Sequence, residues 1–194
     1  MVTYPAFNSK KPPFNDLNHR RLIRDALATK TNSERLAFAI QSDQSSRNQT
    51  ILEFVQSNLK TQYEWKASLN LMDWKARYAK IKSDPDSVYC FGWQNPVSDA
   101  FVTYQVLSTK SPNNFTGWSN KRYDELVGNL RQETRKVRRS KIIKDLETIL
   151  YEEAPVVPIL HQVLRFAYSK RVFGFRANPF GVILFRELRL APNE

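Results

Sequence analysis

Apolar residues recur along this chain with two periods, every second residue in short stretches and every third or fourth residue in longer ones. The period of two predicts strands, and the longer period predicts helices. Strands are expected at 2–7, 36–40, 67–71, 88–93, 156–160, 164–168 and 182–188. Helices are expected at 19–27, 51–59, 74–82, 101–107, 119–130 and 137–150.

Three of these helices follow a residue that can cap a helix, namely Asp16, Asp73 and Ser119. Their side-chain oxygens can accept the backbone N–H groups that a first helical turn leaves without partners. Residues 28–34 are polar and predict a linker. Between 36 and 93 strands alternate with helices, a pattern typical of crossover units and a partly parallel sheet. The fold class expected is therefore α/β, with a mixed sheet flanked by helices.

The length of 194 residues suits one domain or one large lobe, so residues 1–194 are treated as a single unit. Hydrophobic residues make up 41% of the chain and charged residues 25%, as in an ordinary globular protein. Only 5 glycines occur, which disfavours glycine-rich phosphate loops. Cys90 is the single cysteine, so an intrachain disulfide and a CxxC motif are both excluded.

Targeting features were sought at the start of the chain and in its apolar runs. No run approaches the roughly 20 apolar residues of a membrane-spanning helix. Residues 1–5 have neither the basic nor the apolar region of a signal peptide. If the protein works outside the cytoplasm, its targeting sequence is expected to lie outside this chain.

Catalytic motifs are absent from the sequence. It contains no Gly-x-Ser-x-Gly, His-Glu-x-x-His or P-loop pattern. The two histidines, His19 and His161, are far apart and have no nucleophile pattern beside them. We therefore expect a protein that is not an enzyme and that holds no cofactor or metal.

A net charge of +11 raises the question of anionic partners. The basic residues are spread along the chain, and the strongest electrostatic feature is one basic run: Arg131, Arg135, Lys136, Arg138, Arg139, Lys141 and Lys144. This run could follow phosphates, but it could equally be the solvated face of an amphipathic helix. Glu133, Asp145 and Glu147 interrupt it, and no aromatic residues are interleaved for stacking on bases. The solvated face is favoured, and a nucleic-acid or anionic-surface binder is kept as an alternative.

The stretch from the strand at 88–93 into the following turn is the most distinctive. Ligands of α/β sheets bind at the ends of strands, and Gly92 would allow a ligand to approach the backbone closely. Trp93 offers a flat apolar face with one N–H donor, and Asn95 and Asp99 offer polar contacts. On these residues alone, a ligand site and a core tryptophan beside an ordinary turn are equally good interpretations.

Five short patterns in the correct order resemble one known family. They are Asn8–Asp16 followed by Arg20–Leu27, Asp73-Trp74-Lys75, Phe91-Gly92-Trp93, Trp118–Leu126, and Ala154–Phe175. Together they are similar to the extracellular solute-binding proteins of bacterial peptide and nickel ABC transporters, the oligopeptide- and dipeptide-binding type (family 5). The likeness extends over nearly the whole chain.

The resemblance implies a type II clamshell, in which two lobes close on a peptide or small solute. This chain would be a periplasmic-binding-protein-like lobe, mainly the second, and its segments 1–30 and 160–194 would belong to or border the first lobe. Trp74 and Trp93 match aromatic positions that line the family's cleft. Where peptide binders carry an acidic anchor for the ligand's amino terminus, this chain has Pro96, beside Asn95.

The function implied is that of a peptide-like solute-binding component of an ABC import system, periplasmic or extracellular. It would work with a first lobe, upstream or in a second chain, and with permease subunits. The expected ligand-binding residues are Trp74, Trp93, Gln94, Asn95 and Asp99. As the nearest acidic residue, Asp99 could replace the anchor, so Asp99→Asn should weaken binding of a cationic solute. The alternative within this family is a truncated or repurposed interaction protein that has lost transport.

Overall fold

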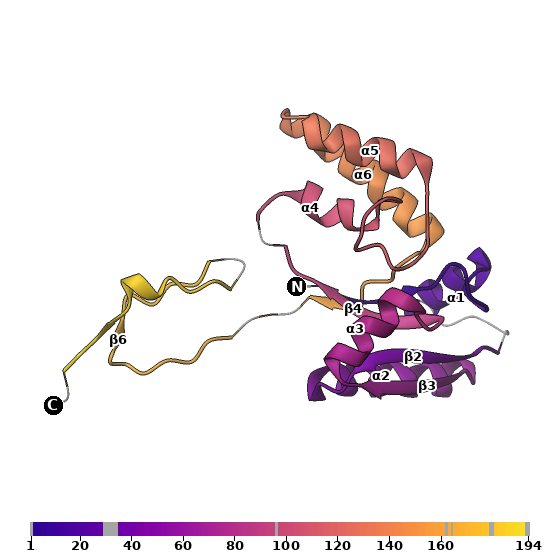
Figure 1. The fold of residues 1–194 in the computed structure, drawn as a ribbon, viewed down its shortest axis with the longest axis horizontal. Helices are drawn as coiled ribbons and strands as arrows, with labels where there is room; N and C mark the ends of the chain where they lie inside the picture. Colours follow the sequence, from indigo (N-terminus) through magenta and orange to yellow (C-terminus); the bar gives the residue numbers. More distant parts are fainter. Residues whose placement is uncertain are drawn as a thin grey trace.

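A computed structural model describes residues 2–28, 35–95, 97–161, 163, 165–178 and 181–192 (Figure 1). Its strands are β1 (Val2–Phe7), β2 (Ala37–Asp43), β3 (Lys66–Met72), β4 (Val88–Trp93), β5 (Leu160–His161), β6 (Val172–Phe173) and β7 (Arg189–Leu190). Its helices are α1 (Leu17–Ala28), α2 (Ser46–Tyr63), α3 (Trp74–Ser83), α4 (Ala100–Tyr104), α5 (Lys121–Gln132) and α6 (Lys136–Glu153), with 3-10 turns η1 (Gln105–Leu107) and η2 (Phe185–Glu187).

The main sheet has five strands in the order β3-β2-β4-β1-β5. Strand β2 runs parallel to both of its neighbours, β3 and β4, and β1 runs antiparallel to β4 and β5. Helices α2 and α3 make the crossovers that parallel neighbours require. The prediction of a mixed, partly parallel sheet flanked by helices is confirmed.

Strand β4 divides its side chains between two layers, because successive residues of a strand point to opposite faces. Val88 and Cys90 belong to the larger core, to which α1 and α2 contribute their apolar residues. Tyr89 lies on the other face and packs with Ile81 of α3. The sheet is thus covered on both faces, as parallel sheets are.

Helices α4, α5 and α6 form a second layer with its own apolar cluster, seen above the sheet in Figure 1. Val156 packs against this cluster and also against the cluster around Tyr89. Three arginines of α1, namely Arg20, Arg21 and Arg24, donate to the backbone carbonyls of residues 151–153 at the carboxyl end of α6. These contacts join α1, which packs in the larger core, to the helical layer.

The last part of the chain extends away from the sheet and the helices (Figure 1). The described residues between 163 and 192, called the C-terminal arm here, form this part and pair β6 with β7 (Figure 1). Its large exposed apolar side chains are Val163, Phe166, Tyr168, Phe173, Val182, Leu184, Phe185 and Leu190. The predicted strand at 182–188 is wrong, since most of it is irregular or in η2. The strand predicted at 164–168 is also wrong for residues 165–168, because the described arm offers them no partner strand.

Smaller corrections concern element boundaries. The side chain of Asp16 accepts from the N–H of Asn18, so α1 begins at Leu17 rather than at residue 19. The cap of α5 is Asn120 instead of Ser119, and its oxygen accepts from the N–H of Tyr123 at 2.8 Å. The strand expected at 156–160 is reduced to a bridge at Val156 and to β5. Of the expected linker 28–34, residue 28 ends α1 and residues 29–34 lie outside the described part.

The buried cysteine gives a direct test of the core. Cys90 is 1% exposed, and burial raises the pKa of its thiol to about 11. The thiolate is the reactive form, so at pH 8 we expect Cys90 to react with a disulfide reagent at least roughly 100-fold more slowly in the folded chain than in urea. Equal rates in both conditions would contradict the packing of β4.

Candidate functional site

The parallel strands β2, β3 and β4 end at one edge of the sheet, which we call the carboxyl edge. Asp43 is the last residue of β2, Asp73 follows β3, and Gln94 follows β4. In open α/β sheets ligands bind outside such an edge, because the crossovers leave a crevice there. The residues after these strands therefore make up the candidate site.

Trp74 is presented at this edge by the start of α3. The Asp73 carboxylate accepts from the N–H groups of Lys75 and Ala76, which fixes the first turn of the helix. Trp74 is the first helical residue and is 58% exposed. Its ring stacks on that of Tyr78 one turn later, with centroids 5.8 Å apart and planes 15° apart. A large aromatic face is thus held in place without being buried.

Arg77 also lies against the ring of Trp74. Its side chain is 3% exposed, and its guanidinium carbon lies 5.3 Å from the centroid of the Trp74 ring. The same guanidinium lies 3.4 Å from the carboxylate of Asp43 on β2 and donates to the carbonyl of Cys90 on β4. Arg77 therefore ties the indole to the two central parallel strands.

Asp43 is the centre of a small polar network at the end of β2. Its carboxylate accepts from the Ser45 N–H at 3.0 Å and from the Asn48 amide at 2.8 Å. Burial acts to raise the pKa of Asp43, but hydrogen bonds from Ser45 and Asn48 and the charge of Arg77 outweigh burial and hold the pKa below its ordinary value. Asp43 is thus a paired carboxylate at neutral pH.

Trp93 lies at the end of β4 and is fixed through its indole nitrogen. The Trp93 N–H donates to the side-chain oxygen of Asn95 at 2.9 Å, and the Asn95 amide donates to the hydroxyl of Thr103 on α4. Asn95 thus joins the strand end to the helical layer and orients the Trp93 ring. These two contacts of Asn95 are internal to the chain, a role that the sequence did not suggest.

Asp99 is also bound within the chain. Its carboxylate oxygen caps α4 by accepting from the Phe101 N–H at 2.9 Å, and it pairs with Arg139 of α6 at 2.5 Å. Arg139 donates in addition to the backbone carbonyls of Leu130 and Glu133, where α5 ends. The charge of Asp99 is therefore balanced by a residue of the supposed phosphate-following run.

Other members of the basic run are paired as well. Glu133 lies 3.1 Å from Arg135 and 3.9 Å from Arg138. Lys136, Lys141 and Lys144 are exposed, with apolar residues of α6 packed on the opposite side. This arrangement is that of a solvated amphipathic helix face.

No cluster of three or more side chains suited to binding a metal ion occurs among the described residues. A ring nitrogen of His19 lies 2.8 Å from the carbonyl of Pro13. His161 belongs to β5 by its backbone, and its side chain lies outside the described part.

Within the same described part, none of the helices has both the length and the apolar character needed to cross a bilayer.

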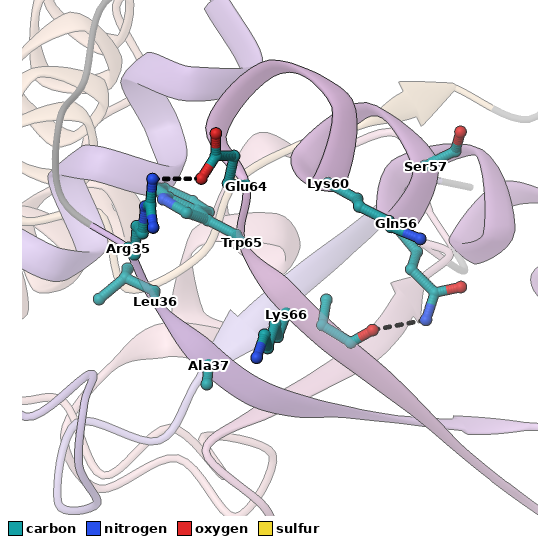
Figure 2. A pocket seen from close by; sticks show the side chains of 10 residues that line it. Arg35, Leu36, Ala37, Gln56, Ser57, Lys60, Glu64, Trp65 and Lys66 are labelled. Atoms are coloured by element: carbon teal, nitrogen blue, oxygen red, sulfur yellow. Dashed lines mark hydrogen bonds and ion pairs between the residues drawn. The ribbon is translucent and has the colours of Figure 1, made fainter.

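A hollow of about 1030 Å³ lies at the other end of the sheet, beside the amino-terminal ends of β2 and β3 (Figure 2). Its lining consists of Arg35, Leu36, Ala37, Gln56, Ser57, Lys60, Glu64, Trp65, Lys66 and Ala67. Arg35 pairs with Glu64 across it, and the Gln56 amide donates to the carbonyl of Ala67. The five predicted site residues are not among its lining residues.

Comparison with known proteins was made on both sequence and structure. The chain is 25% identical over 183 residues to the di/tripeptide-binding protein 1 of Pseudomonas aeruginosa (strain UCBPP-PA14), which covers 92% of this chain and 34% of that protein. Haemophilus influenzae OppA in complex with the peptide RPPGFSPFR superposes with a TM-score of 0.85 at 17% identity, covering 97% of this chain and 48% of that one. The Escherichia coli murein tripeptide binding protein MppA gives a TM-score of 0.83 at 17% identity, covering 99% and 48%. No protein-family profile matches the chain.

The fold is that of a periplasmic-binding-protein-like lobe. By sequence, the chain is similar to dipeptide- and oligopeptide-binding proteins, which are family 5 solute-binding proteins. It spans about a third of the length of these relatives, 34% of the first and 33% of the second. The relatives are named as binding proteins, not as enzymes.

Proposed function

We propose that the chain is the second lobe of a peptide-like solute-binding component of an ABC import system, acting in the periplasm or outside the cell and without catalysis. Its carboxyl edge would form one wall of the cleft, and a first lobe would form the other wall. Solute would then pass to permease subunits. The sequence relatives support this assignment, and one observation carries it here, namely the exposed indole of Trp74 held rigid at the carboxyl edge.

The proposed roles of the five edge residues follow from their contacts. Trp74 and Trp93 would contact ligand directly, because aromatic faces bury much apolar area with few lost rotamers. Asn95 would orient Trp93, and Gln94 is exposed beside it at the strand end. Asp99 would shape the wall by starting α4 and by binding Arg139.

We propose further that the C-terminal arm, within the segment 160–194, docks on the first lobe. Its exposed apolar side chains lack a covering layer in the described chain, and such a concentration is typical of a surface that meets another domain. Segment 1–30 differs, since β1 lies between two strands of the sheet and α1 packs in the core. This segment would therefore border the first lobe.

An NMR titration tests the function. Amide and indole N–H signals of the purified chain would be recorded while a pool of short peptides is added. If the chain binds peptides, we expect shifts clustered around Trp74 and Trp93. Dispersed signals that do not move would overturn the binding function and favour an interaction protein that has lost transport. Binding to DNA that weakens steeply with salt would instead support the nucleic-acid alternative.

Trp74→Ala should weaken peptide binding by roughly tenfold, the effect of removing one aromatic residue from a binding hot spot. The matched control is Phe54→Ala, because Phe54 is an aromatic residue that is also exposed, at 69%, but lies in the middle of α2. Affinities would be measured by calorimetry on both variants. Equal losses in the two variants would contradict the assignment of the carboxyl edge.

A further inference from the structure

The acidic side chains that follow the three parallel strands all have partners within the chain. Asp43 is paired with Arg77, and Asp73 caps α3. Asp99 caps α4 and is paired with Arg139. A ligand that brought a positive charge to this edge would have to displace one of these partners. That displacement would leave a helix end or a buried guanidinium without its hydrogen bonds, at a cost in binding free energy.

The surroundings of the Trp74 ring also disfavour a positively charged ligand at this edge. An indole attracts cations through the negative electrostatic potential of its faces. Here the Arg77 guanidinium already lies 5.3 Å from the ring centroid, buried and fixed by Asp43 and the Cys90 carbonyl. A second cation brought to the exposed part of the ring would be repelled by Arg77. Apolar and aromatic groups, in contrast, would lose nothing by stacking there.

Lys82 places a second cation against the neighbouring ring, that of Tyr78. Its ammonium group lies 4.5 Å from the centroid of Tyr78, which is the ring stacked on Trp74. The edge-to-face contact between Tyr78 and Phe115, with centroids 6.3 Å apart, continues this group of rings toward Phe91 of β4. The aromatic surface next to the carboxyl edge thus already has two cations on it.

We propose that this site selects uncharged apolar or aromatic groups and discriminates against cationic ones, with Arg77 as the residue that sets this specificity. The inference rests on the proposed peptide-binding function and refines it. The ligand class is a peptide-like molecule whose group at Trp74 is neutral, and basic side chains are disfavoured at that position.

A pair of N-acetylated tripeptides tests the proposal, identical except for norleucine or lysine at the central position. The two side chains have similar length and differ mainly in charge. Binding to the full chain would be measured by calorimetry at pH 7. We expect the norleucine peptide to bind roughly fivefold more tightly, in line with the usual strength of an interaction between a cation and an aromatic ring.

The decisive variant is the double substitution Arg77→Gln with Asp43→Asn. It removes both charges of the pair, so the net charge of +11 stays the same and no buried charge is left unpaired. The preference for norleucine should fall to less than about twofold, because the variant no longer has the cation beside Trp74. A preference unchanged in this variant would show that the overall charge causes it, and would overturn the role of Arg77.

Ionic quenchers give a readout that needs no peptide. Trp65 and Trp118 are buried, so iodide and caesium reach mainly Trp74 and Trp93. The difference in fluorescence between the unsubstituted chain and the Trp74→Phe variant gives the signal of Trp74. Iodide should quench Trp74 more strongly than caesium, and the iodide-to-caesium ratio should fall at least roughly twofold in the double variant. An unchanged ratio would overturn the proposal.

The outcomes separate the two proposals. Equal binding of the two peptides to the unsubstituted chain would overturn the charge discrimination while leaving peptide binding in place. Binding of neither peptide would overturn the peptide-binding function and, with it, the ligand class inferred here. Tighter binding of norleucine that disappears in the double variant supports both.

Discussion

Replacing Arg77 with alanine is expected to lower the free energy of unfolding by about 3 kcal/mol. The substitution removes the buried member of the pair with Asp43, and breaking such a pair by removing one member is strongly destabilising. It also leaves the Cys90 carbonyl without its donor and the Trp74 ring without its second support. Urea unfolding followed by circular dichroism would measure the change.

Two further variants show whether the loss comes from the ion pair. The double substitution Arg77→Gln with Asp43→Asn leaves no unpaired charge, so it should recover more than half of the loss. Lys75→Ala removes an exposed cation from the same helix and should change stability by less than about 0.5 kcal/mol. If Lys75→Ala is as costly as Arg77→Ala, the effect belongs to the helix and not to the pair.

The same pair predicts a pH dependence. The folded-state pKa of Asp43 lies below its value in the unfolded chain, which is about 4. A lowered pKa stabilises the fold above the unfolded-state value, and this stabilisation is lost as the pH falls through the folded-state pKa. The difference in stability between the unsubstituted chain and the double variant should therefore be constant near pH 7 and change only below about pH 4. A difference that changed between pH 6 and 8 would point to another group.

The stretch from 36 to 93 was predictable because local and tertiary preferences agree there. Strands such as 88–93 are apolar on both faces and also buried on both faces. The cap at Asp73 acts within three residues of itself, so the start of α3 could be read directly from the sequence. Trp74 was placed correctly at the head of α3, although its exposure at the carboxyl edge comes from the arrangement of the strands.

The arm and the polar contacts could not be predicted in this way. Residues 182–188 have apolar residues at strand spacing, but a strand also needs a partner, and the sequence does not show which segments leave the body. The sequence pattern did not single out Arg77. One signal was present, since Arg77 and Ile81 are four residues apart and therefore share the buried face of α3. Its partner Asp43 comes from a different strand, which only the fold brings close.

The contacts of Asn95 and Asp99 illustrate the same limit at the site itself. Both were expected to face the ligand, because polar residues after a strand often do. Their partners, Thr103 and Arg139, belong to helices that pack beside this turn only in the folded chain. The position of the candidate site thus followed from topology, whereas the internal contacts of Asn95 and Asp99 could be seen only in the structure.

Replacing Arg20 with alanine is the second substitution expected to have a large effect, about 2 to 3 kcal/mol of unfolding free energy. Arg20 is 6% exposed and donates to the carbonyls of Phe14, at 2.7 Å, and Glu153, at 3.0 Å. Without it both carbonyls lose a charged donor, and the carboxyl end of α6 loses a cation that complements its dipole. The link between α1 and the helical layer would be weakened at its most buried point.

The matched control lies one residue along the same helix. Arg21→Ala removes a contact of the same kind, from the Arg21 guanidinium to the carbonyl of Glu152 at 2.7 Å, but on the exposed side. Water can replace that donor, so the loss should stay below about 1 kcal/mol. Urea unfolding of both variants, with the helical layer followed by the fluorescence of Trp118, would show whether the layer separates before the sheet unfolds. Equal losses for Arg20 and Arg21 would mean that burial of the guanidinium contributes nothing to holding the helical layer on the sheet.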